Sequence, residues 1–152
     1  MGELIEDLAA FRDRLSGNER TVRVRDLDVV DKAVAWLLDC RHELGYWGVK
    51  DVAETSLCCI AIARWAGPRD VQELGTTGEW LLGEAVAGAW DTPWDSGVAV
   101  QALLAIGFGD DPRAQQALER LCALDPEHTA RTVGPHHAAQ VLNALHASRA
   151  GF

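Results

Sequence analysis

The sequence has few lysines and no long apolar run, and each shortage excludes a class of function. Two lysines contribute to 14 basic residues, against 23 aspartates and glutamates, and the net charge is −9. Such a surface repels phosphate and anionic lipid, so we do not expect a nucleic-acid partner. The apolar stretch GVAVQALLAIGFG is too short to span a bilayer, and the acidic N-terminus does not resemble a secretory signal. We expect a cytoplasmic protein without a membrane span.

Cysteine motifs and nucleotide-binding motifs are also missing. Cys58 and Cys59 are adjacent, Cys40 and Cys122 lie within apolar helical patterns, and no Cys-x-x-Cys spacing occurs. We therefore expect four buried free thiols. The sequence contains no Gly-x-Gly-x-x-Gly, Walker loop, Gly-x-Ser-x-Gly or His-Glu-x-x-His.

An internal repeat is the main positive feature. The segments that begin WLLDCRHELGYWG at Trp36 and WLLGEAVAGAW at Trp80 share Trp-Leu-Leu, a Gly-x-Trp sequence, a polar link, a second apolar helix and a terminal glycine. A weaker third copy follows without tryptophans, where Leu121 takes the place of Trp80 and Val141 that of Val100. Apolar spacing predicts a pair of helices in each copy, and the second helix is apolar around most of its circumference.

The length and the repeat predict one all-α domain. A chain of 152 residues can bury one sizeable core. We expect residues 1–25 to form an N-terminal helix, over Glu3 to Leu15, and a turn. We expect residues 26–150 to form about three helical hairpins.

Capping residues suggest where the helices begin and end. Asp28 and Asp111 are expected as N-caps, and Thr76 begins a capping-box pattern. Gly67 and Gly107 stand where left-handed caps would end the second helices. The apolar face expected on the first helix comprises Val29, Ala33, Trp36, Leu37 and Cys40.

Roughly residues 28 to 107 resemble the QW motif of the terpenoid cyclase and protein prenyltransferase superfamily. That motif reads aromatic, Leu, three residues, Gln, three residues, Gly, any residue, Trp. The first copy differs only in having Arg41 in place of glutamine; the second copy is one residue shorter and has Ala85 there. The resemblance implies an α/α toroid, in which outer and inner helices alternate around an apolar cavity. The motif positions are Trp36, Arg41, Gly45, Trp47, Trp80, Gly88 and Trp90.

We expect these motif residues to have a structural role. Each tryptophan can bury on the order of 200 Å² against a neighbouring helix, and glycine allows a turn between the two aromatic residues. A polar side chain at Arg41 can bond to exposed groups at a helix end. A direct role in binding substrate is the alternative.

The resemblance also suggests proton donors. In the cyclases, an Asp-x-Asp-Asp acid at the start of an inner helix protonates an alkene. Counting back from the terminal glycines puts Glu54 on the donor position of the first copy. In the second copy it puts Trp94 on that position and Asp95 on the final aspartate. The simpler interpretations are an N-cap for Asp95 and a solvated first-turn acid for Glu54.

Aromatic and imidazole side chains complete the candidate ligand-binding set. Tyr46, Trp65 and Trp94 could shield a carbocation through their π faces, and His136 and His137 begin the last predicted helix. We interpret the two histidines first as a helix start, with His137 bonded to a backbone group.

Metal and diphosphate sites are not expected. Protein prenyltransferases hold zinc with Asp, Cys and His. The candidate zinc ligands here match no dependable spacing, so we expect no metal or cofactor and leave zinc and magnesium open. Diphosphate binding needs clustered basic residues, whereas Arg64, Arg69 and Arg131 are scattered. The candidate zinc ligands are His136, His137, Cys58, Cys59 and Asp51.

The chain is too short to form a complete toroid, and this bears on its expected function. A ring of six helix pairs would need about 270 residues, and three pairs would leave the apolar side of the inner helices open. We therefore expect the concave face to bind an apolar, isoprenoid-like ligand or a partner protein. We also expect a second half-toroid, either a second copy of this chain or another protein, to complete the ring. The alternatives are a small or accessory terpenoid cyclase using Glu54 or Asp95, and a protein-interaction scaffold without a ligand.

Overall fold

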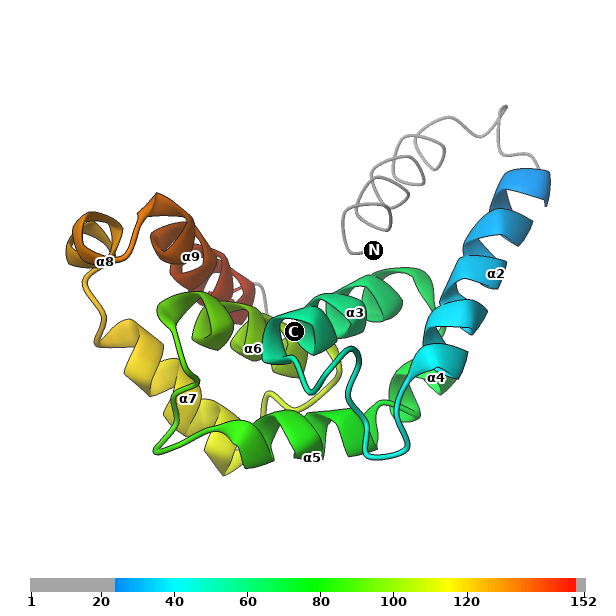
Figure 1. Cartoon of the computed structure of the whole chain (residues 1–152), viewed down its shortest axis with the longest axis horizontal. Helices are drawn as coiled ribbons and strands as arrows, with labels where there is room; N and C mark the ends of the chain where they lie inside the picture. The colour runs from blue at the N-terminus through cyan, green and yellow to red at the C-terminus, as the bar shows by residue number, and fades with distance from the viewer. Residues whose placement is uncertain (1–23, 150–152) are drawn as a thin grey trace.

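The described part of the chain is helical. The computed structural model describes residues 24–149, and the side chains of residues 28–149. These residues form eight helices and no strand (Figure 1), which confirms the predicted all-α class. The helix predicted over residues 3–15 lies outside the described residues. In chain order the helices are α2 (Val24–Cys40), α3 (Val52–Trp65), α4 (Pro68–Gln72), α5 (Gly75–Glu84), α6 (Pro93–Ala105), α7 (Pro112–Cys122), α8 (Pro126–Thr132) and α9 (Pro135–Arg149).

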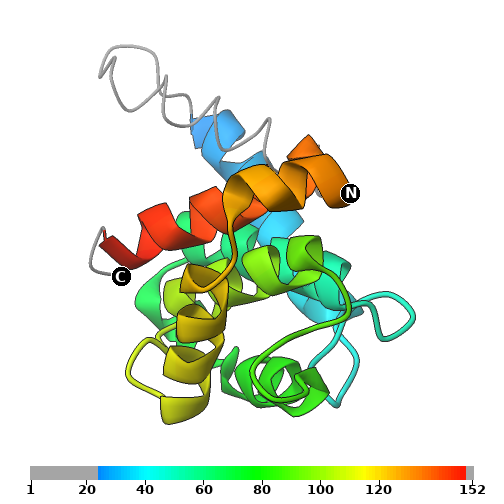
Figure 2. The same cartoon turned by 90° about the vertical axis from the view of Figure 1, so that its left-hand side faces the viewer.

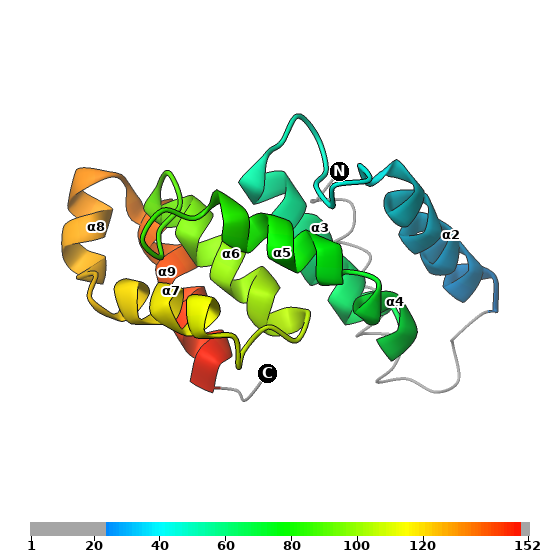
Figure 3. The ribbon, with the colours of Figure 1, turned by 90° about the horizontal axis from the view of Figure 1, so that it is seen from below.

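The longer helices form an inner row and an outer row. In the inner row, α6 packs against both α3 and α9. The outer helices α5 and α7 lie in front of this row when the molecule is seen from below (Figure 3). α2 stands at one end of the array, and Figure 2 views the opposite end, which carries α7, α8 and α9. The described residues thus give three outer–inner pairs, while closure into a toroid stays a prediction.

Two short helices, α4 and α8, were not predicted from the sequence. The short helices α4 and α8 each begin with a proline, directly after the N-cap residues Gly67 and Asp125 respectively. Proline suits this position because its missing N–H would have no helical partner there.

Within the described residues, no helix is both long enough and apolar enough to cross a membrane.

The inner helices α6 and α9 approach closely at Gly97. A Cβ atom on Gly97 would lie 2.7 Å from the carbonyl carbon and oxygen of Gln140. Gln101 donates from Nε2 to Oε1 of Gln140 (2.9 Å) and to the carbonyl of Gly97 (3.0 Å). Backbone contact and part-buried polar bonds therefore hold this pair of helices together.

The starts of α2 and α5 differ from the prediction. α2 begins at Val24, so Asp28 lies inside the helix and does not cap it. Leu74 occupies the N-cap position of α5 without a side-chain bond, so the capping box of Thr76 and Glu79 is not formed. In each case helical backbone continues upstream of the polar residue. Asp111 does cap α7, as predicted, by accepting from the backbone N–H of the residue after Pro112.

Only one of the two predicted glycine caps is formed. Gly107 has φ +93°, the left-handed conformation expected of a C-terminal cap. Gly67 instead has φ −75° and ψ 170° and precedes α4. Pro68 explains the difference, because a residue before proline is driven into extended backbone.

Of the apolar face predicted for α2, Leu37 is buried, whereas Val29, Trp36 and Cys40 are exposed. Val30 and Leu37 are buried, whereas Val29 is 51% exposed and Trp36 is 47% exposed. Both faces are apolar, so spacing alone could not choose between them. The consequence is an exposed apolar stripe along an outer helix.

The cysteines divide into two pairs. Cys58 and Cys59 are buried on α3, and burial raises the pKa of the Cys58 thiol to about 12. Cys40 and Cys122 are exposed at the last residues of α2 and α7, so their predicted burial is wrong.

Candidate binding site

Trp47 and Trp90 make the same contact in the first two repeats. The indole Nε1 of Trp47 donates to the carbonyl of Leu37 over 2.8 Å, and that of Trp90 donates to the carbonyl of Leu81 over 2.9 Å. Both indoles are buried. Each one ties the connection after an outer helix back to that helix.

A hydroxyl on α3 and another on α6 complete these two connections. The backbone N–H of Trp47 donates to Oγ1 of Thr55 (2.9 Å), and that of Trp90 donates to Oγ of Ser96 (3.0 Å). Thr55 and Ser96 are both buried. Thr55 and Ser96 therefore occupy equivalent positions in the two repeats.

This equivalence corrects the register between the candidate acids. Asp51 caps α3 by accepting from the N–H of Glu54 (2.8 Å), and Thr92 caps α6 by accepting from the N–H of Asp95 (3.1 Å). Glu54 and Asp95 thus hold the same place, whereas counting from the terminal glycines had matched Glu54 with Trp94. The error arises because the two glycines end their helices differently.

The motif glycines contact the next outer helix. Gly45 has φ +104°, and a Cβ there would lie 2.9 Å from the carbonyl of Thr76 at the start of α5. Gly88 has φ +79°, and its Cβ would lie 3.0 Å from the side chain of Gln116 on α7. Glycine suits the left-handed conformation at both positions, and at Gly45 it also allows the close approach to the α5 backbone.

Arg41 adds a link that only the first repeat has. Its guanidinium donates to the carbonyl of Glu73 at the C-cap of α4 (2.8 Å) and to Oγ1 of Thr77 (3.4 Å). It also lies 6.0 Å from the centroid of the Trp47 ring. Ala85, the corresponding residue of the second repeat, has no polar side-chain group.

Tyr46 lies between two rings of the protein itself. It stacks on His42 with centroids 4.3 Å apart, and its centroid is 5.3 Å from that of Trp80. The tyrosine is buried. Trp65 is also buried, but it ends α3 and so lies at the opposite end of that helix from Glu54.

Three of the predicted ligand-binding residues come together at the starts of α6 and α9. The ring centroid of Trp94 lies 5.8 Å from that of His136 and 6.5 Å from that of His137. The backbone N–H of Trp94 donates to Nδ1 of His137 (3.1 Å). His137 thus bonds to a backbone group. Among the described residues, no three His, Cys, Asp or Glu side chains are arranged to hold a metal ion.

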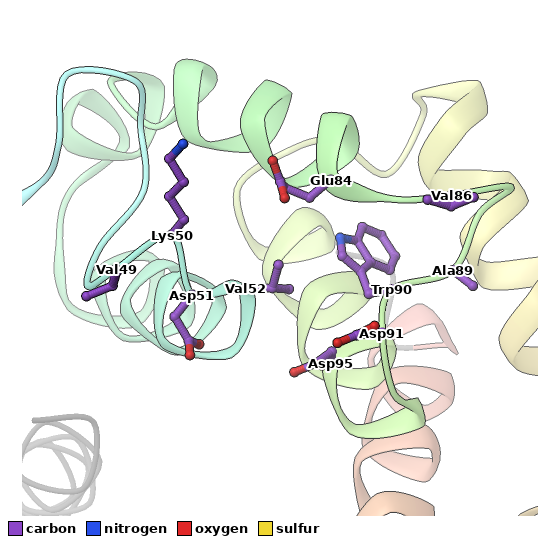
Figure 4. Close-up of a pocket in the computed structure, with 10 residues that line it drawn as sticks. All are labelled: Val49, Lys50, Asp51, Val52, Glu84, Val86, Ala89, Trp90, Asp91 and Asp95. Carbon is purple, nitrogen blue, oxygen red and sulfur yellow. The ribbon is translucent and has the colours of Figure 1, made fainter.

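A cavity of about 550 Å³ opens between the start of α3, the end of α5 and the start of α6 (Figure 4). Its lining carries four carboxylates and one ammonium group. Asp95 is the only lining residue that was predicted as a catalytic or ligand-binding residue, and Asp51 had been considered only as a metal ligand. The charged lining residues are Lys50, Asp51, Glu84, Asp91 and Asp95.

Two valines flank this cavity in the connections between outer and inner helices. Val49 is 97% exposed and Val86 is 79% exposed. In Figure 4 they lie on opposite sides of the opening, with Trp90 between them. These residues were missed because each belongs to a short connection without periodicity. One feature of the sequence could have indicated them: each of the two connections contains an apolar residue close to acidic residues.

Comparisons with known proteins leave the resemblance as a prediction. No protein family matches this sequence, and neither the curated proteins nor the solved structures gave a match. The site is therefore interpreted from its own geometry.

Proposed function

We propose that this chain is a non-catalytic helical-repeat binding module and that the cavity between the starts of α3 and α6 is its binding site. One observation carries the proposal: the cavity of about 550 Å³ combines carboxylates with two exposed valines. Helix ends and indole bonds hold its walls, so the site is preformed. Preformed concave sites with a few convergent polar groups are typical of ligand binding.

The charges favour a positively charged partner. Asp51, Glu84, Asp91 and Asp95 face a single cation, Lys50, across the lining. The helix dipoles at the starts of α3 and α6 offset part of this negative charge. A lysine or arginine side chain would lower the remaining negative charge further. Exposed apolar groups beside a charged pocket suit a protein segment that covers them.

The same geometry argues against proton-transfer chemistry. An acid that protonates an alkene must be shielded from water, whereas Glu54 is exposed. Asp95 is half-buried, but its carboxylate accepts from the Thr92 hydroxyl at 3.1 Å as part of the α6 cap. A hydrocarbon ligand at the cavity would bury carboxylates without partners, which is costly.

Peptide binding tests the proposal. Fluorescent peptides that carry arginine beside leucine should bind, and matched peptides with glutamate in place of arginine should not. The double variant Asp91→Asn and Asp95→Asn should bind about tenfold more weakly, which corresponds to about 1.4 kcal/mol. Binding should also weaken with salt. The matched control is Asp110→Asn with Glu119→Gln, two exposed acids outside the cavity lining.

Incubation with polyprenyl diphosphates tests the enzyme alternative. A cyclised product that disappears in Glu54→Gln or Asp95→Asn would contradict the non-catalytic proposal. An isoprenoid lipid found in the purified protein by mass spectrometry would favour an apolar ligand instead.

Assembly is a second candidate function, favoured by exposed apolar residues on the terminal helices. Val29 and Trp36 on α2 and Leu142 on α9 are each about half exposed. Completion of a ring by a second copy or another half-toroid would cover them. Light scattering that shows a monomer at all concentrations would contradict self-assembly.

A further inference from the structure

A smaller second cavity lies directly beside the candidate binding site. Its volume is about 140 Å³, and it opens between the connection after α5, the start of α6 and the end of α7. Ala89, Trp90 and Asp91 line both cavities, and Figure 4 shows them along one side of the first cavity. Because the two cavities share this wall, they are parts of one groove. A ligand that fills the first can extend into the second.

The second cavity combines one guanidinium group with apolar side chains. Among the described residues that line it, Arg120 is the only cation, and Leu121, Leu124 and Pro93 are apolar. The guanidinium of Arg120 has no hydrogen bond or ion pair with any described residue. Asp91, on the shared wall, is the only carboxylate of this lining. The groove therefore changes from mainly negative in the first cavity to a free positive charge in the second.

A closed turn supports the stem of Arg120. The backbone N–H of Val86 donates to the carbonyl of Ala89 over 2.8 Å, and the N–H of Ala89 donates back over 3.1 Å. Between them lies Gly88, where an added Cβ would lie 3.3 Å from Cγ of Arg120. The stem thus packs on the turn, although Arg120 as a whole is exposed. An arginine whose stem is already held loses less freedom when it binds an anion.

We propose that the ligand of this groove is a peptide that ends in the second cavity. Its terminal carboxylate bonds to Arg120, and its last side chain is apolar and packs against Leu121 and Leu124. A basic side chain earlier in the peptide pairs with Asp91 and Asp95 in the first cavity. A carboxylate and an apolar side chain belong to one residue only at a C-terminus, because the side chains of aspartate and glutamate carry the carboxylate themselves. This inference rests on the proposed function and specifies its partner further.

The shared wall sets the spacing of the two charges on the peptide. Its three residues, Ala89 to Asp91, span at most about 10 Å. An extended peptide advances about 3.3 Å per residue. The basic residue should therefore lie about three positions before the last one.

Fluorescence anisotropy with labelled peptides tests the proposal on the full chain. The reference peptide ends in Arg-Ser-Gly-Leu with a free carboxylate, and its matched partner has the same sequence and an amidated end. We expect the amide to bind about tenfold more weakly, because it loses charge-assisted hydrogen bonds. In Arg120→Gln the difference between the two peptides should vanish, while binding of the amide stays unchanged. The matched control is Arg69→Gln, at an exposed arginine outside both cavities, which should keep the full difference.

The outcomes separate this inference from the proposed function. Equal binding of the free and amidated peptides, or a difference that persists in Arg120→Gln, would overturn the inference and leave the proposed function standing. Failure of both peptides to bind would contradict the two together. An amidated peptide that ends in glutamate and binds as tightly as the free leucine peptide would overturn the inference in favour of an internal acidic residue. Circular dichroism of Arg120→Gln verifies that the fold is retained.

Discussion

The backbone N–H of Trp94 donates to Nδ1 of His137 over 3.1 Å, and this bond joins the first turn of α6 to α9. The N–H groups of a first helical turn have no partner within their own helix. His137 supplies such a partner from a helix more than forty residues away in the chain. An imidazole that accepts at Nδ1 and remains neutral carries its hydrogen on Nε2.

Replacement of His137 should therefore weaken the contact between α6 and α9. We expect His137→Ala to lower the free energy of unfolding by about 1 kcal/mol, since a part-buried N–H loses its acceptor. Urea denaturation measures the change. His136→Ala, at an exposed neighbour, should stay within about 0.5 kcal/mol of the wild type. Equal losses in the two variants would contradict the capping role.

The two repeated indole bonds should have similar energies. Trp47→Phe and Trp90→Phe each remove a donor and leave a buried backbone carbonyl of an outer helix without it. We expect each to lower the free energy of unfolding by about 1–3 kcal/mol. Trp36→Phe is the control because Trp36 is 47% exposed. Denaturant unfolding of the three variants should give two similar losses and one small change.

Replacement of Gly45 by alanine should lower stability by more than conformational strain alone would. Gly45→Ala places a Cβ 2.9 Å from the backbone of α5, at φ +104°. Gly107→Ala has comparable strain at φ +93° but no atom within 4 Å of its Cβ. Strain alone costs about 1–2 kcal/mol, and forced overpacking costs about 1–3 kcal/mol more. Thermal and urea unfolding should therefore rank Gly45→Ala well below Gly107→Ala; equal stability would contradict the close approach.

The stabilising charge on Asp111 should disappear in acid. The side-chain hydrogen bond from Arg113 lowers the pKa of Asp111 from 3.8 to about 2. Because the folded-state pKa is the lower one, the charge stabilises the fold above pH 3.8, and this contribution is lost as the pH falls towards 2. At neutral pH, Asp111→Asn should lower Tm below that of the wild type. The gap should close between pH 4 and 2, and a gap of constant size over this range would contradict the role of the charge.

The helical repeat could be predicted from sequence because its signals are local. Apolar spacing located the long helices, and Asp111 before Pro112 marked the start of α7. Gly107 ended α6 as expected. The same glycine argument failed at Gly67, because the proline that follows it imposes extended backbone.

The spacing of apolar residues could not show which of two apolar faces of α2 is buried. Val29 and Val30 are equally apolar, and the packing of α2 against α3 is not visible in the spacing of either residue. The candidate cavity was missed for a related reason. Its valines and acids come from separate connections, and the helix packing that brings them together leaves no periodic pattern in the sequence.

The contact of each motif glycine with the following outer helix has a consequence for extending the chain. Gly45 meets the start of α5, and Gly88 meets α7. A duplicate of residues 68–107 inserted after Gly107 would therefore present Gly88 with a second α5, a surface that already accommodates a glycine. The array could then be lengthened by whole copies of this segment, and its curvature would be set by the same glycine contacts between neighbouring units.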